Sequence, residues 1–367
     1  MKDINIAQSI LSKRREKGLT QDELANYIGV SKASVSKWET GQSYPDITLL
    51  PWLATFFNMS IDELMGYTPQ MAKGDIRALY KRLSTDFAEK PFDEVMADAR
   101  MNIKTYYSCY PLLLQMVVLI LNHYQLAETS EAQASLLEEA TALCERIRTE
   151  STDILLAQQA NSMEAVLYLM RQQPAEVIDL LNEVALHPFS QNEIILASAF
   201  EMKGDHEAAK RALQITGYQC VLYLLGSAVM LLSLYKNNRD RFEEILRRSL
   251  VMVDAFHLKM LHPNTFIQLA STAAFCLVEL GDYERALHFL RESVEAFKNF
   301  TFPIMLQGDD YFDLLGDWFA DFDLGNNSPR DEKLIKKSFI ALLTSPALTP
   351  LFELPEYKSI VADAERL

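Results

Sequence analysis

The segment that ends at Gly66 carries local signals that divide it into short helices, and these constrain the fold more than any other feature of the sequence. Thr20 and Glu23 stand at the spacing of a capping box, in which each side chain bonds the other residue's main-chain N–H. Ser60 and Glu63 repeat that spacing. Glycine, which commonly ends a helix, recurs between the apolar stretches. The pattern predicts five short helices within residues 1–66, with the second, third and fifth opened by Thr20, Ser31 and Ser60 and the fourth beginning at Asp46 or Thr48.

The third of these helices, after a capping serine at position 31, has two distinct faces. Val35 and Trp38 are three positions apart and are expected to pack inward. A short helix with lysines and small residues on its outer face suits the major groove of DNA, because lysine can read guanine, alanine can touch a thymine methyl and serine suits either base. The residues that face outward are Lys32, Ala33, Ser36 and Lys37.

The stretch from Gly18 to Leu64 closely resembles the Xre-type (Cro/phage-repressor) helix-turn-helix family over its whole length. The resemblance implies a structural ion pair between Arg14 and Glu39, and it implies a dimer that binds a palindromic operator. A solvated face remains the alternative for the two lysines, and packing against the helix end remains the alternative for Tyr44. The resemblance gives base-contacting roles to Lys32, Ala33 and Lys37, and phosphate-contacting roles to Gln21, Ser34, Gln42, Ser43 and Tyr44.

Charge is distributed unevenly along the chain, whose net charge is −15. Residues 1–66 hold seven Lys and Arg against eight Asp and Glu, and the remainder holds 28 against 42. DNA repels an acidic surface, so any contact with nucleic acid must come from a local face of the first segment. The sequence therefore predicts a DNA-binding domain at 1–66, a linker at 67–75 and a separate domain at 76–367.

That second domain reads as helical throughout, with short hydrophilic turns that recur. The turn segments begin at Arg171, Lys203, Lys236 and Leu280, at spacings of 32, 33 and 44 residues. Residues 270–297 resemble a tetratricopeptide repeat. We therefore predict an all-α chain in which 76–367 is a tetratricopeptide-like α-solenoid, with a longer helix or loop in the 44-residue step and a capping region at about 303–367. An irregular helical bundle is the alternative.

A DNA-binding head followed by such a solenoid resembles the Rgg/PlcR/NprR group of peptide-pheromone (quorum-sensing) receptors. The resemblance implies that the concave face binds a short signalling peptide. An extended peptide has unpaired main-chain groups, so polar side chains on the first helix of each repeat are candidate ligands. A polar, solvated face without a ligand is the alternative for each of them. The candidates are Gln159, Asn161, Ser162, Gln191, Asn192, Ser198, Glu201, Asn264, Gln268, Ser271 and Glu279.

Other functions find less support in the sequence. It has no nucleophile–base motif, glycine-rich phosphate loop or zinc-ligand spacing, so we predict no enzyme activity, no metal and no cofactor. The cysteines at 109, 144, 220 and 276 are far apart and are expected to be buried, reduced thiols. No secretory signal or membrane span is evident, so a cytoplasmic location is expected. A helix-turn-helix adaptor whose solenoid docks a partner protein is the competing function.

Overall fold

The structure is a computed structural model that describes residues 5–67, 69–185 and 192–367. Within those ranges it contains helices, turns and one isolated bridge between Met305 and Asn327, and no β-strand. The buried hydrophobic side chains form three clusters, one in the N-terminal segment and two in the remainder. The expected all-α fold, a helix-turn-helix head followed by a helical-repeat region, is confirmed.

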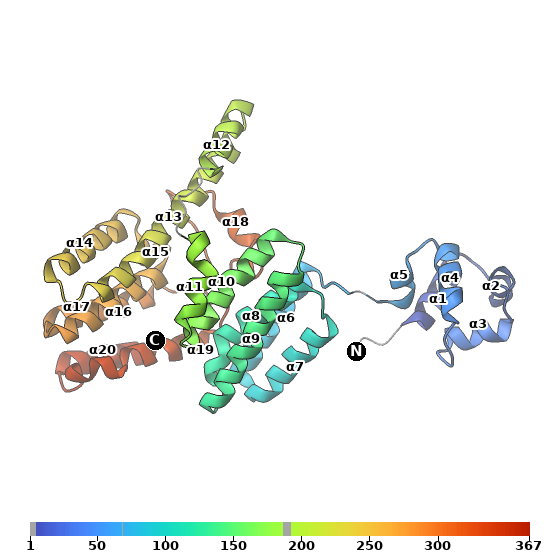
Figure 1. Cartoon of the computed structure of the whole chain (residues 1–367), viewed down its shortest axis with the longest axis horizontal. Helices are drawn as coiled ribbons and strands as arrows, with labels where there is room; N and C mark the ends of the chain where they lie inside the picture. The colour runs from blue at the N-terminus through green and yellow to red at the C-terminus, as the bar shows by residue number, and fades with distance from the viewer. Residues whose placement is uncertain (1–4, 68, 186–191) are drawn as a thin grey trace.

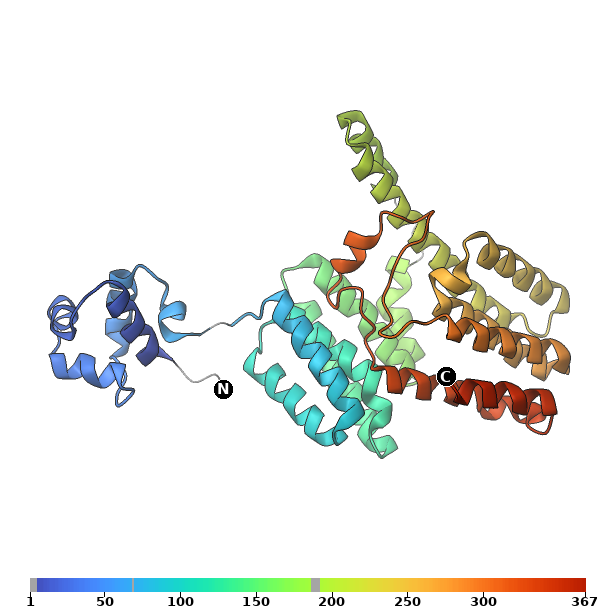
Figure 2. The same cartoon turned by 180° about the vertical axis from the view of Figure 1, so that it is seen from behind.

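The N-terminal helices form a small domain around Ile10, Leu24 and Leu53, each of which is fully buried. Both predicted capping boxes are present. The Thr20 hydroxyl accepts from the Glu23 N–H, and the Thr20 N–H donates to the Glu23 carboxylate. Ser60 and Glu63 make the same two bonds. Figures 1 and 2 show these helices set apart from the others and joined to them by an extended segment. The domain comprises α1 (Ile6–Glu16), α2 (Gln21–Ile28), α3 (Lys32–Glu39), the 3-10 turn η1 (Ile47–Leu49), α4 (Leu50–Phe57) and α5 (Ile61–Met65).

A second core is built by the helices that follow the linker. The first of them begins at Lys73, three residues inside the predicted linker, because Gly74 is tolerated in a first turn and Asp75 favours the positive end of the helix. The apolar run that starts near Pro111 forms a helix whose residues are mostly buried. These helices are α6 (Lys73–Glu89), α7 (Phe92–Thr105), α8 (Tyr110–His123), η2 (Tyr124–Leu126), α9 (Ser130–Glu150), α10 (Ile154–Met170) and α11 (Pro174–Ala185).

The four predicted repeat turns each lie between two helices. At three of them the chain takes a left-handed residue, namely Gln172 (φ 58°), Gly204 (φ 83°) and Gly281 (φ 75°). In each, that residue's N–H bonds a carbonyl three positions back, and the next N–H bonds one five positions back. The turn geometry is therefore shared, although only two of the three have the glycine that a positive φ favours. The helices paired across the later turns are α12 (Asn192–Lys203), α13 (His206–Leu234), α14 (Arg239–Ala255), α16 (Pro263–Glu279) and α17 (Tyr283–Lys298).

The solenoid is interrupted at α13. This one 29-residue helix serves as the second member of the pair with α12 and the first member of the pair with α14. A regular repeat would turn between those roles, so α12 and the first part of α13 project from the body (Figure 1). Met230, in the C-terminal half of α13, is 64% exposed.

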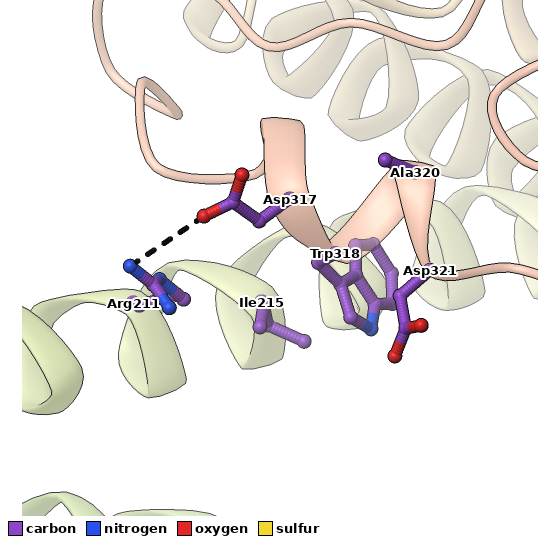
Figure 3. Close-up of a pocket in the computed structure, with 6 residues that line it drawn as sticks. All are labelled: Arg211, Ile215, Asp317, Trp318, Ala320 and Asp321. Carbon is purple, nitrogen blue, oxygen red and sulfur yellow. Dashed lines mark ion pairs between the residues drawn. The ribbon is translucent and has the colours of Figure 1, made fainter.

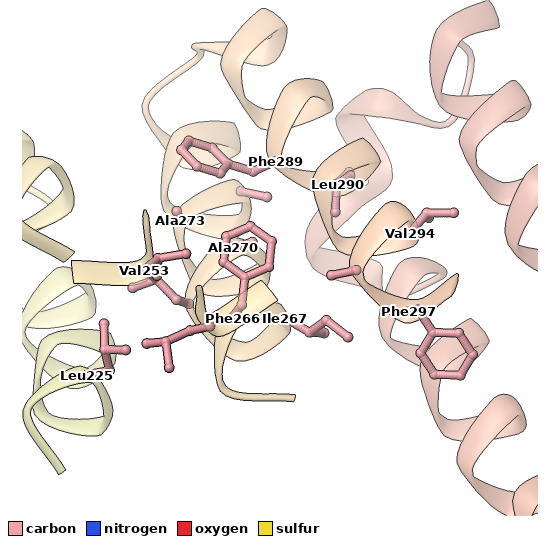
Figure 4. Packing of buried hydrophobic residues seen from close by; sticks show 14 of the residues in the cluster. Leu225, Val253, Phe266, Ile267, Ala270, Ala273, Phe289, Leu290, Val294 and Phe297 are labelled. Atoms are coloured by element: carbon pink, nitrogen blue, oxygen red, sulfur yellow. The ribbon is translucent and has the colours of Figure 1, made fainter. Parts of the chain in front are cut away.

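The C-terminal half of α13 packs into the third core, where Leu225 and Val253 meet α16 and α17 (Figure 4). The fully buried small side chains of Ala270 and Ala273 let these helices approach closely. The 44-residue step contains an added helix, α15 (Leu258–Leu261). By length and composition α13 could cross a membrane, but its inner face belongs to this core.

The tail does two things. Its last helices cover the final repeat, with Phe339 stacked on Phe297 at 4.0 Å between ring centroids. Its aromatic segment, residues 311–322, packs on α13, where Phe312 and Phe319 contact Tyr218. The end of this segment and the chain that follows lie against the second core, where Arg77 of α6 donates to the carbonyls of residues 320, 322 and 323. The tail therefore ties the two cores together as well as covering the end. Its elements are α18 (Gly316–Ala320), α19 (Glu332–Leu343), η3 (Pro346–Leu351) and α20 (Pro355–Glu365).

One cysteine differs from expectation. Cys109, Cys144 and Cys276 are buried, but Cys220 is exposed. It lies on the outer face of α13, which the interrupted solenoid leaves uncovered.

Candidate nucleic-acid interface

The third helix presents the predicted base-contacting residues because its other face is held in the core. Val35 is fully buried and Trp38 is 4% exposed, so both pack inward as predicted. Ser31 begins the helix by accepting from the Ser34 N–H. The start of α3 is thus fixed in space, and its outer face carries exposed side chains at Lys32, Ala33 and Lys37, with Ser36 half-buried beside them.

An ion pair fixes the other end of α3. Arg14 Nε lies 2.5 Å from Glu39 Oε1 and its Nη2 lies 2.9 Å from Oε2, so the predicted pair is present in a two-point geometry. The same guanidinium donates to the Leu19 carbonyl. Burial alone would raise the pKa of the Glu39 carboxyl, but hydrogen bonds from Arg14 and Gln21 outweigh it, and the pKa is lowered. The carboxylate is therefore ionised at neutral pH and orients α3 against α1.

Gln21 has a different side-chain partner from the one predicted. Its Nε2 donates to Glu39 Oε2 at 2.9 Å, so this amide supports the ion pair. Its main-chain N–H, at the first position of α2, is one of the groups that a helix leaves unpaired at its N-terminus. A phosphate contact by Gln21 remains a prediction, and the main chain is the better placed part of the residue to make it.

The two lysines of α3 differ in their surroundings. Lys32 Nζ lies 2.9 Å from Asp22 Oδ2, and both side chains are about 60% exposed. Lys37 has no ion pair in the part of the chain that the structure describes. An exposed ion pair contributes under about 1 kcal/mol, so Lys32 can leave Asp22 for a stronger partner. Asp22 was not predicted as part of the site, since nothing in the sequence pairs positions ten apart on different helices.

The remaining predicted phosphate contacts lie near the two ends of α3. Ser34 is half-buried, with its hydroxyl 2.9 Å from that of Ser31. Tyr44 is 65% exposed, which leaves its ring available to a partner. Gln42 is exposed and Ser43 is half-buried in the loop between α3 and η1. Their role in binding phosphate remains a prediction.

The candidates for a peptide groove are scattered. Those on α10 and α16 lie on the body, whereas those on α12 lie on the projecting arm (Figures 1 and 2). Several have partners of their own: the Ser162 and Ser198 hydroxyls donate to carbonyls of their own helices, and Glu201 is 2.7 Å from His206. Gln159, Asn192, Asn264 and Gln268 are exposed, Asn161 is half-buried, Glu279 pairs with Lys236, and Gln191 lies outside the described residues.

Ser271 is a correction to that prediction. It is 2% exposed and belongs to the inner face of α16, so it cannot reach a ligand in a surface groove. The physical reason is that α16 is covered on several sides, by α13, α15, α17 and η3. More of its circumference is buried than a two-layer solenoid would predict.

None of the groove candidates lines either of two hollows in the described part of the helical region. The first, about 460 Å³, lies between α13 and α18, where Trp318 forms a wall and Arg211 faces Asp317 at 3.8 Å (Figure 3). It is shallow and open. The second, about 540 Å³, lies at the turn between α10 and α11.

Comparison with known proteins identifies the N-terminal segment. A helix-turn-helix family model matches residues 10–64. The HTH-type transcriptional activator BcrR of Enterococcus faecalis is 44% identical over 52 residues, which is 14% of this chain and 26% of BcrR. The chain thus matches about a quarter of that relative's length.

Two solved structures resemble the chain over a greater length. PlcR of Bacillus thuringiensis, in complex with the peptide PapR7 and DNA, is 15% identical, with 80% of this chain and 95% of PlcR covered and a TM-score of 0.28. The apo form of ComR from S. thermophilus is 13% identical, with 81% and 94% covered and a TM-score of 0.26. Scores this low do not place the residues of this chain on sites of the other two.

The family match covers every element from α1 to α5 except the first turn of α1 and the last residue of α5. It agrees with the capping boxes, the inward pair on α3 and the ion pair described above. Residues 10–64 of this chain therefore belong to the helix-turn-helix family.

Proposed function

We propose that the chain is a sequence-specific DNA-binding transcription regulator. The observation that carries this is α3, whose buried pair Val35 and Trp38 leaves Lys32, Ala33 and Lys37 on its outer face. Base edges in the major groove are read by side chains on one short helix held in this way. The rest of the chain is too acidic to add an attractive surface for DNA.

Within α3, Lys37 is the principal base reader in this proposal, because it is exposed and free of ion pairs in the described structure. Lys32 joins it once Asp22 is displaced, while Ala33 and Ser36 make the shorter contacts. The phosphate contacts come from Gln21, Ser34 and the loop residues 42–44. Such contacts set the register and carry no sequence information by themselves.

The test is binding to a labelled duplex from the chain's own promoter, measured by fluorescence anisotropy at a stated salt concentration. Lys37→Ala should weaken specific binding by about 1–3 kcal/mol. Lys104→Ala, which removes an exposed lysine of α7, is the matched control and should bind as the unaltered chain does. Unchanged binding by the Lys32→Ala/Lys37→Ala double variant would overturn the assignment of α3.

We further propose that two copies bind a palindromic operator, since one short helix reads only a few base pairs. The proposed location of this binding is the cytoplasm. The helical region would form the dimer and sense a ligand, with a short peptide as the leading class. PlcR, which the chain resembles over 80% of its length, is solved in complex with the peptide PapR7. Sedimentation of the chain with and without operator DNA measures the number of copies bound.

An adaptor role, in which the helical region docks a partner protein, is the second candidate. The exposed apolar side chains Leu224, Met230 and Leu234 on α13 favour it, because apolar side chains left exposed on a helix are available for contact with another protein. A gene for a small secreted peptide beside the chain's own gene would favour the sensor, and a toxin or kinase gene would favour the adaptor.

A further inference from the structure

The hollow at the turn between α10 and α11 has the size of a small-molecule site, at about 540 Å³. It is bounded by η2, by the start of α9 and by the end of α10. Like the first hollow it is open to solvent, and polar side chains outnumber apolar ones in its lining. The lining residues on which the argument depends are Glu138, Arg171, Gln172 and Gln173.

Two consecutive lining residues depart from the pattern of the other repeat turns. The first is Gln172, whose φ of 58° is left-handed although the equivalent residues are Gly204 and Gly281. A side chain in this conformation costs about 1 kcal/mol or more. Residues held in this way cluster at ligand sites, where the strain is tolerated for another purpose.

The second departure is Gln173. In the other three turns this position holds a short acceptor that caps the following helix: Asp205, Asn238 and Asp282 accept from the N–H three residues on. The longer Gln173 does not do this, and its Oε1 is buried without a hydrogen-bond donor. A buried, unsatisfied acceptor costs about 1–3 kcal/mol, so the oxygen gains a bond without losing one if the side chain turns it toward a donor in the hollow.

Donor capacity lies two residues away on Arg171. Its Nη2 is 3.2 Å from Glu138 Oε1 and its Nη1 is 3.5 Å from Thr141 Oγ1, which are both long contacts for a guanidinium. A guanidinium carries five N–H groups, and only two of them make these contacts, so the side chain can also donate to a carbonyl oxygen. Glu138 balances its charge, which favours an uncharged acceptor over a carboxylate.

We propose that this hollow binds a ligand through an amide group. Gln173 turns its Oε1 toward the hollow and accepts the amide N–H, while Arg171 donates to the amide carbonyl. An amide carries an N–H donor and a carbonyl acceptor on adjacent atoms without net charge, which matches an acceptor and a donor on these two side chains. The amide comes either from a peptide main chain or from the side chain of a free amino acid.

The site would give the proposed sensing role of the helical region a ligand-binding position, and its biological role rests on that proposed function. The binding itself does not, because it is measured on the full chain without DNA. If no amide probe binds, the proposal that α3 binds DNA is unaffected. If DNA does not bind, the amide-binding result still stands by itself.

The experiment is ligand-observed saturation-transfer NMR on the full chain at millimolar probe. The probes are acetyl-trialanine amide, the lactic-acid depsipeptide of the same length, and free L-glutamine. We expect at least one amide probe to bind and the depsipeptide, whose backbone lacks N–H groups, to bind about tenfold more weakly. Binding by the trialanine alone indicates a peptide ligand, and binding by glutamine alone indicates a free amino acid.

Gln173→Met keeps the length of the side chain and removes the oxygen. It should weaken amide binding about tenfold while leaving the unfolding temperature equal or higher, because the oxygen has no partner to lose. Gln158→Met, an exposed glutamine of α10 outside the hollow, is the control and should bind normally. The proposal is overturned if no amide probe binds, if the depsipeptide binds equally, or if Gln173→Met binds unchanged. A lowered unfolding temperature in Gln173→Met would show that the oxygen has a structural partner, which also overturns it.

Discussion

Arg14 and Glu39, 25 positions apart, meet through two hydrogen bonds of 2.5 and 2.9 Å at the junction of α1 and α3. Their side chains are only 11% and 3% exposed, so both charges are largely removed from water. The pair holds the last residue of the proposed recognition helix against α1. Its contribution is therefore to the position of α3 more than to net stability.

Removing one partner of this pair should cost more than removing both. Arg14→Met leaves the Glu39 carboxylate buried with only Gln21 as a donor, and we expect a loss of about 3–5 kcal/mol. The double variant Arg14→Met/Glu39→Met should lose clearly less. Hydrogen exchange of the α1 and α3 amides in the full chain measures both. Additive losses in the double variant would mean that the two residues act independently.

Asp22 should limit the affinity for DNA. Its carboxylate holds Lys32 at 2.9 Å and lies beside the surface proposed to face phosphate. Asp22→Asn frees the lysine and removes a repulsive charge, so we expect DNA to bind about three- to tenfold more tightly at low salt. Glu16→Gln breaks a comparable surface pair with Lys13 and should have little effect. Equal effects of the two variants would remove Asp22 from the interface.

The turn at Gln172 should be stabilised by glycine. Glycine adopts a φ of 58° without the steric penalty that glutamine incurs, and part of that gain is offset by its greater freedom when unfolded. We expect Gln172→Gly to raise the free energy of unfolding by about 0.5–1 kcal/mol. The reverse change Gly281→Gln, at a site with no atom within 4 Å to clash with a Cβ, should lower it. Denaturant unfolding of both variants decides the sign.

His123 should make the second core sensitive to acid. The ring is 1% exposed and stacks on Phe87, and burial lowers its pKa to about 4. The unfolded chain, with a histidine pKa near 6.5, binds the proton more readily than the folded one between these values. Stability therefore falls as pH falls, by about 2 kcal/mol from pH 7 to pH 5.

His123→Leu should remove that part of the pH dependence, although it also loses the contact of Nδ1 with the Leu119 carbonyl. His262 has a pKa that burial lowers as well, so it contributes a similar slope in both proteins. The comparison of unfolding free energies at the two pH values isolates His123. Identical slopes in the variant and the unaltered chain would contradict the assignment.

Features that depend on neighbours in sequence were predicted well. The two capping boxes and the helix ends at Gly29 and Gly66 involve hydrogen bonds that span three to five residues. The same holds for the repeat turns, whose bonds reach back three and five positions. The inward direction of Val35 and Trp38 follows from helical periodicity alone. The proposed DNA interface could therefore be outlined from the sequence.

Features that depend on distant segments were not predictable. The pairing of Asp22 with Lys32, the burial of Ser271 and the return of residues 320–323 to Arg77 each join elements that no local rule connects. The sequence by itself determined the capped helix starts of the first 66 residues and the positions of the four repeat turns, because those are set by hydrogen bonds within a few residues. The tertiary structure alone decided that α13 runs through a predicted repeat boundary and that Gln173 lines a hollow, because both follow from packing among helices far apart in the chain.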